Sequence, residues 1–215
     1  MMFRRTFLTK ALFSLMVAIP LTGGAFLLEA AQPVHADTKG AEAFIATLAK
    51  EAVDSLTDKA IDRSTRIGNF RKLFNAHFAV ENIGRWVLGK NWRSASEDEQ
   101  TEYLKLFEDL MVVSYVDRFA DYAEEELVVK GSQEQKNVIM VQSELNQPAS
   151  NQAIRVDWRV GEKDGAYKIL DVVVQGTSMS ATLRSEFGSI IKQKDGSVAG
   201  LIEVLREKTA ELNAS

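Results

Sequence analysis

The spacing of apolar residues changes along this chain from a helical period to an alternating one and back. Between residues 40 and 125, apolar side chains recur every three or four positions, as they do on one face of a helix. After residue 126, apolar and polar side chains alternate, which is typical of strands, and the helical period returns near residue 178. The pattern predicts helices over 40–58, 62–74, 80–88, 96–125, 178–192 and 197–212. It predicts strands over 127–130, 137–145, 152–160 and 166–174.

The connections between the predicted strands are short, at 131–136, 146–151 and 161–165. Loops of this length join antiparallel neighbours, because a parallel pair needs a longer crossover. Helices followed by a sheet and then by more helices are typical of an α+β protein. The sequence therefore predicts helices packed over a four-stranded antiparallel sheet, in a single domain over 37–215.

The first 36 residues differ in kind from the rest of the chain. A basic pair, Arg4-Arg5, precedes a weakly apolar run over 11–28, and Ala36 offers a small residue for cleavage. These are the parts of a secretory signal peptide, so we expect residues 1–36 to be removed and the mature protein to be periplasmic. The basic pair resembles the twin-arginine export signal. Export of the unfolded chain and an uncleaved anchor are the alternatives.

Residues 84–91 read GRWVLGKN and differ in one residue from a phosphate-binding loop signature. Asn91 stands where that signature has the Ser or Thr hydroxyl that holds magnesium. The residues between the two glycines are large and apolar, and they continue a helical face that begins upstream. We therefore expect a helix over 80–88, ended by Gly89 in a left-handed conformation, and no nucleotide site.

Charge and cysteine content exclude several classes of function. Without the three basic residues and one acidic residue of the predicted leader, the 26 basic and 30 acidic side chains become 23 and 29, a net charge of −6. An acidic chain without a basic block has no electrostatic reason to bind nucleic acid. The absence of cysteine excludes disulfides, thiolate metal sites and a cysteine nucleophile, so apolar burial must stabilise the fold.

No catalytic or metal-binding group stands out in the predicted mature chain. His77 is its only histidine, and the segment 175–179 lacks the second glycine of a nucleophile elbow, so we expect Ser178 or Ser180 to cap the next helix. Asp171 alternates with apolar residues on its strand, so it needs a cationic partner if that face is covered. Arg184 is the predicted partner, as a structural ion pair.

The helix predicted over 96–125 begins at a capping box, Ser96 to Glu99, and carries more apolar surface than one stripe. Such a helix is buried on most sides. It is either an ordinary core helix, or part of its surface lines a cavity for an apolar ligand together with the strand face over 154–158. Periodicity does not separate these two interpretations.

Four segments resemble the MlaC, or toluene-tolerance, family of periplasmic phospholipid carriers. They are YKILDVVVQGTSM at 167–179, LRSEF at 183–187, the segment 83–92 with its Leu-Gly and Trp, and the helix over 96–115. The order of predicted elements agrees over the whole mature chain. This sequence departs from the family pattern at Leu183, where Tyr is usual, and at Gln175, where Glu is common. A hopanoid-biosynthesis-associated branch of the family is also compatible with these residues.

The resemblance implies a fold with acyl chains held between the helices and the sheet and with the headgroup near solvent. It implies a carrier of phospholipid that needs no cofactor and no enzymatic activity. No apolar seam in the sequence argues against a monomer. Its partners would be a lipoprotein–porin complex at the outer membrane and an inner-membrane ABC transporter with a lipid-binding ring protein. The alternatives are an adaptor without a lipid ligand and, with less support, an enzyme acting on lipid headgroups. The residues predicted to line the cavity are Phe107, Leu110, Val113, Val156, Trp158, Ile169, Val173, Phe187 and Ile191.

Overall fold

The computed structural model describes residues 37–120, 125–148 and 152–214. The expected leader lies outside these ranges, so its cleavage after Ala36 stays a prediction. The helices are α1 (Thr38–Leu56), α2 (Arg63–His77), α3 (Val80–Leu88), the 3-10 helix η1 (Gly89–Ser94), α4 (Glu97–Ala120), α5 (Met179–Gln193) and α6 (Val198–Ala214). The strands are β1 (Glu126–Gln135), β2 (Val138–Gln147), β3 (Gln152–Lys163), β4 (Ala166–Val174) and β5 (Thr177–Ser178). The predicted α+β class is confirmed.

The sheet is antiparallel, in the order β1-β2-β3-β4-β5. It has five strands within the described residues, where four were expected, because Thr177–Ser178 turns back and pairs with the end of β4. β1 also continues to Gln135 through a bulge between Val129 and Gly131, so most of the loop expected at 131–136 is strand. A bulged edge strand with polar residues lacks the alternation from which strands are predicted.

A second bulge reverses the faces of β4. The pairing of β4 with β3 shifts by one residue at Leu170. One inserted residue moves every later side chain to the opposite face of a strand. Ile169 faces the helices before the bulge, and Val172 and Val174 face them after it. Val173, which was expected on this inner face, therefore points away from it.

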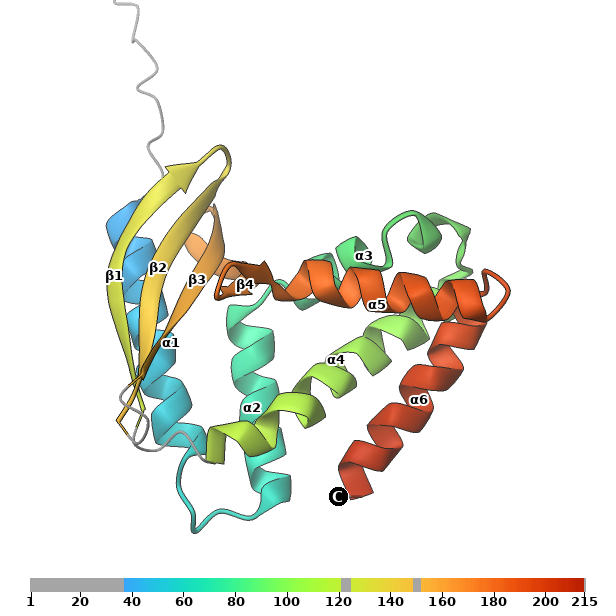
Figure 1. Cartoon of the computed structure of the whole chain (residues 1–215), viewed down its shortest axis with the longest axis horizontal. Helices are drawn as coiled ribbons and strands as arrows, with labels where there is room; N and C mark the ends of the chain where they lie inside the picture. The colour runs from blue at the N-terminus through green and yellow to red at the C-terminus, as the bar shows by residue number, and fades with distance from the viewer. Residues whose placement is uncertain (1–36, 121–124, 149–151, 215) are drawn as a thin grey trace, which may run out of the picture. The chain divides into compact units, whose positions relative to one another are not determined.

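The apolar side chains form two separate clusters. Helix α1 lies along one face of the sheet (Figure 1), and the two form the first cluster with Ala41, Ile45, Leu48, Ile139, Val141, Val160 and Ile169. The second cluster lies among the helices, where α4 packs against α2, α3, α5 and α6. Tyr103 and Phe107 of α4 are fully buried there. Burial on several sides accounts for most of the apolar surplus of α4.

The junction between α2 and α3 attaches the helices to the sheet. Phe78 packs against both clusters and forms an isolated bridge with Ile169 of β4. The N–H of Ala79 donates to the Ile169 carbonyl at 2.9 Å. The Lys168 ammonium donates to the Asn75 carbonyl at 3.1 Å, where the C-terminal end of a helix favours a cation. One short segment therefore fixes the position of α2 on β4.

Local hydrogen bonds set where two helices begin. The Ser96 N–H donates to Glu99 Oε2 at 2.8 Å, and the Glu99 N–H donates to Ser96 Oγ at 3.2 Å, so the predicted capping box is confirmed. Ser178 caps α5 by accepting from the Ala181 N–H at 3.0 Å. The GRWVLGKN segment forms the end of α3 and the start of η1, with φ of 61° at Gly89.

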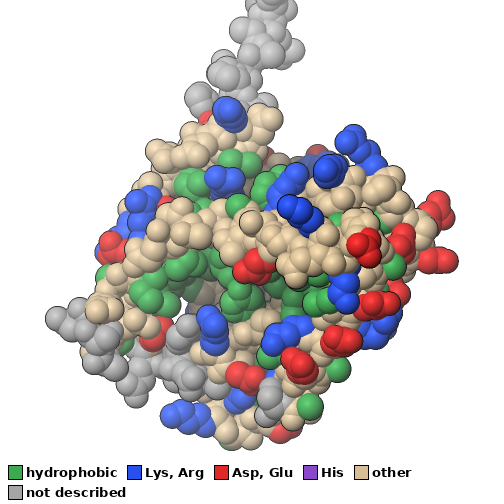
Figure 2. Space-filling view, turned by 45° about the vertical axis from the view of Figure 1, so that its right-hand side comes forward, with side chains coloured by type: hydrophobic (Ala, Val, Ile, Leu, Met, Phe, Trp, Pro, Cys, Tyr) green, Lys and Arg blue, Asp and Glu red, His purple; other side chains and the backbone are tan. Residues whose placement is uncertain are grey.

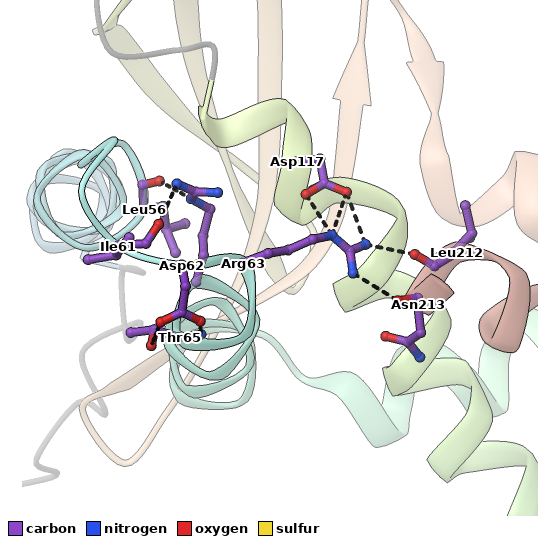
Figure 3. A network of polar contacts seen from close by, with 9 residues as sticks. Leu56, Ile61, Asp62, Arg63, Thr65, Asp117, Leu212 and Asn213 are labelled. Carbon is purple, nitrogen blue, oxygen red and sulfur yellow. Dashed lines mark hydrogen bonds and ion pairs between the residues drawn. The ribbon is translucent and has the colours of Figure 1, made fainter. Parts of the chain in front are cut away.

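Arg63, at the start of α2, connects three helices (Figure 3). Its Nε and Nη2 atoms each donate to the Asp117 carboxylate of α4 at 3.0 Å. Its Nη2 and Nη1 atoms donate to the carbonyls of Leu212 and Asn213 at the end of α6, at 2.7 and 3.3 Å. Carbonyls in the last turn of a helix lack donors within that helix. The Arg63 guanidinium supplies these missing donors and holds the end of α6 in place.

Replacing Arg63 by Met should lower the free energy of unfolding by about 1.5–3 kcal/mol, because it removes charged hydrogen bonds to one carboxylate and two carbonyls. Chemical denaturation measures this change. The matched control is Arg206→Met, which removes an exposed pair with Glu102 and should change stability by less than about 1 kcal/mol. Equal effects of the two substitutions would show that the Arg63 contacts add nothing beyond a surface ion pair.

Candidate binding cavity

Two apolar cavities lie between the sheet and the helices. The first has a volume of about 280 Å³ and is enclosed by α1, α2 and the inner faces of strands β1 to β4. The second has a volume of about 200 Å³ and lies between α2, α4, the start of α5 and strands β3 and β4. Figure 2 shows hydrophobic side chains gathered around a hollow on the face it presents. Such a space can remove the apolar surface of a ligand from water.

An aromatic row, defined as Phe70, Phe74 and Phe78, separates the two cavities. These residues are four positions apart on α2 and its C-cap, so they share one helical face. The ring centroids of Phe70 and Phe74 are 6.1 Å apart, and those of Phe74 and Phe78 are 4.8 Å apart. All three residues line both cavities, and so does Trp158 of β3. The row therefore acts as a partition between two adjoining apolar spaces.

The polar atom of Trp158 is satisfied within the sheet. Its Nε1–H donates to Ser143 Oγ at 2.9 Å, and the Ser143 hydroxyl in turn donates to the Val156 carbonyl at 2.6 Å. Ser143 is buried, so neither group needs water or a ligand as a partner. This chain of hydrogen bonds holds the indole against the cavities and leaves only its apolar ring to face them.

Tyr115 of α4 also lines the second cavity. Burial raises the pKa of its hydroxyl above the ordinary value, and the Arg118 guanidinium, 5.6 Å from the ring centroid, lowers that pKa only in part. The hydroxyl is therefore neutral at physiological pH. The cavity thus gains a polar but uncharged group from this residue.

His77, which could suggest catalysis, makes contacts that account for it structurally. His77 Nε2 lies 2.8 Å from Glu51 Oε2, and the His77 ring lies 5.5 Å from that of Phe44. Across the residues that the structure describes, no group of three or more His, Asp or Glu could hold a metal ion. Nor is any helix of the described ranges long and apolar enough to cross a membrane.

Asp171 has different partners from the one predicted. Its carboxylate accepts from the Ser178 hydroxyl at 2.6 Å and from the Ser180 N–H at 3.0 Å, with Arg159 Nη1 at 3.9 Å. The predicted partner, Arg184, donates to the Trp86 carbonyl of α3, and no ion pair joins it to Asp171 among the described residues. The tight turn after β4 brings the first N–H groups of α5 onto the carboxylate, and Arg184 lies further along α5.

The structure brings three of the nine predicted cavity residues to the cavities. Val156 lines the first, Phe107 the second and Trp158 both. Val173 lies on the other face of β4 because of the bulge at Leu170. The other five are buried and line neither cavity: Leu110, Val113, Ile169, Phe187 and Ile191.

Sequence reasoning missed the contribution of α1 and α2. Leu48 and Val53 of α1 line the first cavity, and the aromatic row of α2 lines both. The four-residue spacing of the row was a usable signal, since it marks one apolar helical face. We predicted that α4 lines the cavity because it has more apolar residues than one helical face needs. Most of these residues belong to the core instead.

Comparison with solved structures defines the class of fold. A structure from Ralstonia solanacearum, described as a phospholipid-binding protein in complex with a phospholipid, matches with a TM-score of 0.70. The match covers 80% of this chain and 98% of that chain, at 20% sequence identity. The protein therefore has the α+β fold of that phospholipid-binding protein.

Sequence comparison then defines the family. A protein of Haemophilus influenzae named "Intermembrane phospholipid transport system binding protein MlaC" is 27% identical over 119 residues, which are 53% of this chain and 56% of that protein. This chain therefore spans about half the length of that relative. The family model described as "MlaC protein" matches residues 46–207. The chain belongs to the MlaC family, which confirms the resemblance seen in its sequence.

A double-mutant cycle tests the partners of Asp171. Asp171→Ala should lower the free energy of unfolding by about 1.5–3 kcal/mol, because it leaves a buried N–H of α5 without its charged acceptor. Its coupling energy with Ser178→Ala should be at least about 0.5 kcal/mol, and with Arg184→Ala close to zero. Denaturation of the single and double variants gives both values. A larger coupling energy with Arg184 than with Ser178 would show that Asp171 and Arg184 form the ion pair expected from the sequence.

Proposed function

We propose that the mature protein is a soluble periplasmic phospholipid carrier that holds the acyl chains of its cargo in the two cavities. It moves lipid between the outer and inner membranes and so supports the lipid asymmetry of the outer membrane. The observation that carries this proposal is the pair of adjoining cavities, whose linings consist mostly of apolar side chains. The names of the two relatives, which describe phospholipid transport and phospholipid binding, support the same function.

The size of the hydrophobic effect explains why such a carrier is needed. A phospholipid with two chains of about 15 methylenes each exposes apolar surface that costs on the order of 20 kcal/mol in water, at ~0.8 kcal/mol per methylene. Unassisted transfer between membranes is therefore slow. A protein that replaces water with apolar side chains lowers this barrier without any reactive group. A carrier accordingly needs no catalytic residues and no cofactor.

The residues proposed to contact the chains come from both sides of the aromatic row. Val156 and Leu48 would contact a chain in the first cavity, and Phe107 and Met111 a chain in the second. Each cavity is smaller than the roughly 300–1,000 Å³ typical of sites for drug-sized ligands. Loading therefore requires side chains of the aromatic row to move, so that the two adjoining spaces join. The headgroup would remain near solvent.

The proposed partners follow from family membership. They are a lipoprotein–porin complex at the outer membrane and an inner-membrane ABC transporter with a lipid-binding ring protein. The main alternative is an adaptor with a filled interior and no lipid ligand. The two cavities favour the carrier, because an adaptor gains nothing from leaving apolar space unfilled.

Replacing Val156 by Glu should abolish uptake of phospholipid from vesicles, because it places a carboxylate against the acyl chains. Val173→Glu is the matched control, since Val173 lies on the opposite face of the neighbouring strand and should leave uptake near the wild-type level. Mass spectrometry of lipid extracted from the re-isolated protein measures uptake, and circular dichroism confirms that both variants fold. A folded Val156→Glu variant that loads as much lipid as the wild type would exclude the first cavity as the site.

A further inference from the structure

A third, more polar space lies outside the two apolar cavities. It is a cleft of about 650 Å³ between α3, the turn that joins β1 to β2, and the bulged parts of β3 and β4. Its lining combines two cations, Lys136 and Arg159, with apolar side chains that include Trp86 and Leu170. We call it the basic cleft. The lipid proposal above leaves this space unused.

The walls of the basic cleft are held in place by the fold. Lys136 sits at the tip of a tight hairpin with φ of 58°, between the paired residues Gln135 and Val138. Trp86 is 50% exposed, and the Arg184 guanidinium lies 4.8 Å from its ring centroid. Half-exposed Trp beside Arg is a composition typical of protein interfaces rather than of free surface.

The charge of the basic cleft is opposite to that of the chain as a whole. The whole chain has a net charge of −4, whereas the lining of the cleft carries two cations, Lys136 and Arg159, and one carboxylate, Asp171. Asp171, which also lines the cleft, accepts from two serines and pairs with Arg159 at 3.9 Å, and Glu81 pairs with Arg85. No ion pair among the described residues involves Lys136, so its exposed ammonium is available to attract an anion.

From this arrangement we propose that the basic cleft docks an acidic segment of a partner protein. A flat membrane surface does not enter a cleft, whereas a protruding segment with carboxylates and an apolar side chain fits both Lys136 and Trp86. Ile83, Asp171 and Ser180 line both this cleft and the second cavity, so the two spaces adjoin. The same three residues would place a docked partner directly beside the cargo.

Nuclear magnetic resonance of the ¹⁵N-labelled protein tests the proposal, since the chain has three Trp indole signals and Trp86→Phe identifies one of them. The probe is a synthetic peptide rich in Glu and Leu, and its control has every Glu replaced by Lys. The acidic peptide should shift the Trp86 signal and leave that of Trp158 unchanged. The substitution Lys136→Glu should raise the Kd of the acidic peptide by about tenfold. The control substitution Lys192→Glu, at an exposed position on α5, should not change this Kd.

Three outcomes would overturn the docking site. They are no shift of the Trp86 signal with the acidic peptide, an equal Kd for Lys136→Glu and the wild type, or an equal shift with glycerol phosphate or with phosphatidylglycerol vesicles. The last outcome would assign the basic cleft to a lipid headgroup or a membrane surface. Lipid uptake by the same Lys136→Glu sample should equal that of the wild type. If the wild type binds the acidic peptide but takes up no phospholipid, the carrier function alone would be overturned.

Discussion

The attachment of α2 to β4 at Phe78 is the contact on which the rest of the structure depends. One hydrophobic cluster joins α1 to the sheet and the other joins the remaining helices, and Phe78 packs against both. The Ala79 N–H and the Lys168 ammonium add polar bonds at the same place. The two cavities lie beside this contact, on either side of the aromatic row.

The bulge at Leu170 determines which side chains face this space. It turns Val172 and Val174 toward the helices and leaves Asp171 where the Ser180 N–H of α5 reaches its carboxylate. This bond fixes the first turn of α5, which forms part of the wall of the second cavity. A bulge that alters facing beside a binding site is a common structural device.

Elements with a strong period were predictable from the sequence, and local irregularities were not. The helix over 80–88 and the capping box of α4 follow from residues close together in the chain. The bulges, the short β5 and the partner of Asp171 depend on pairing between strands, which no single-segment pattern contains. Among the predicted cavity residues, Trp158 and Val156 do line the cavities, and the regular alternation of apolar and polar residues in the sequence of β3 indicated them. The aromatic row was missed because the sequence does not reveal which of several apolar helices faces a gap.

Whether the space between the two clusters holds a phospholipid is best measured by native mass spectrometry of the protein, purified from the periplasm without detergent. We expect a mass that exceeds the polypeptide by one phospholipid, which is released when the protein is denatured. A protein that carries only its own mass, and gains none after incubation with phospholipid vesicles, would show that the space holds no phospholipid.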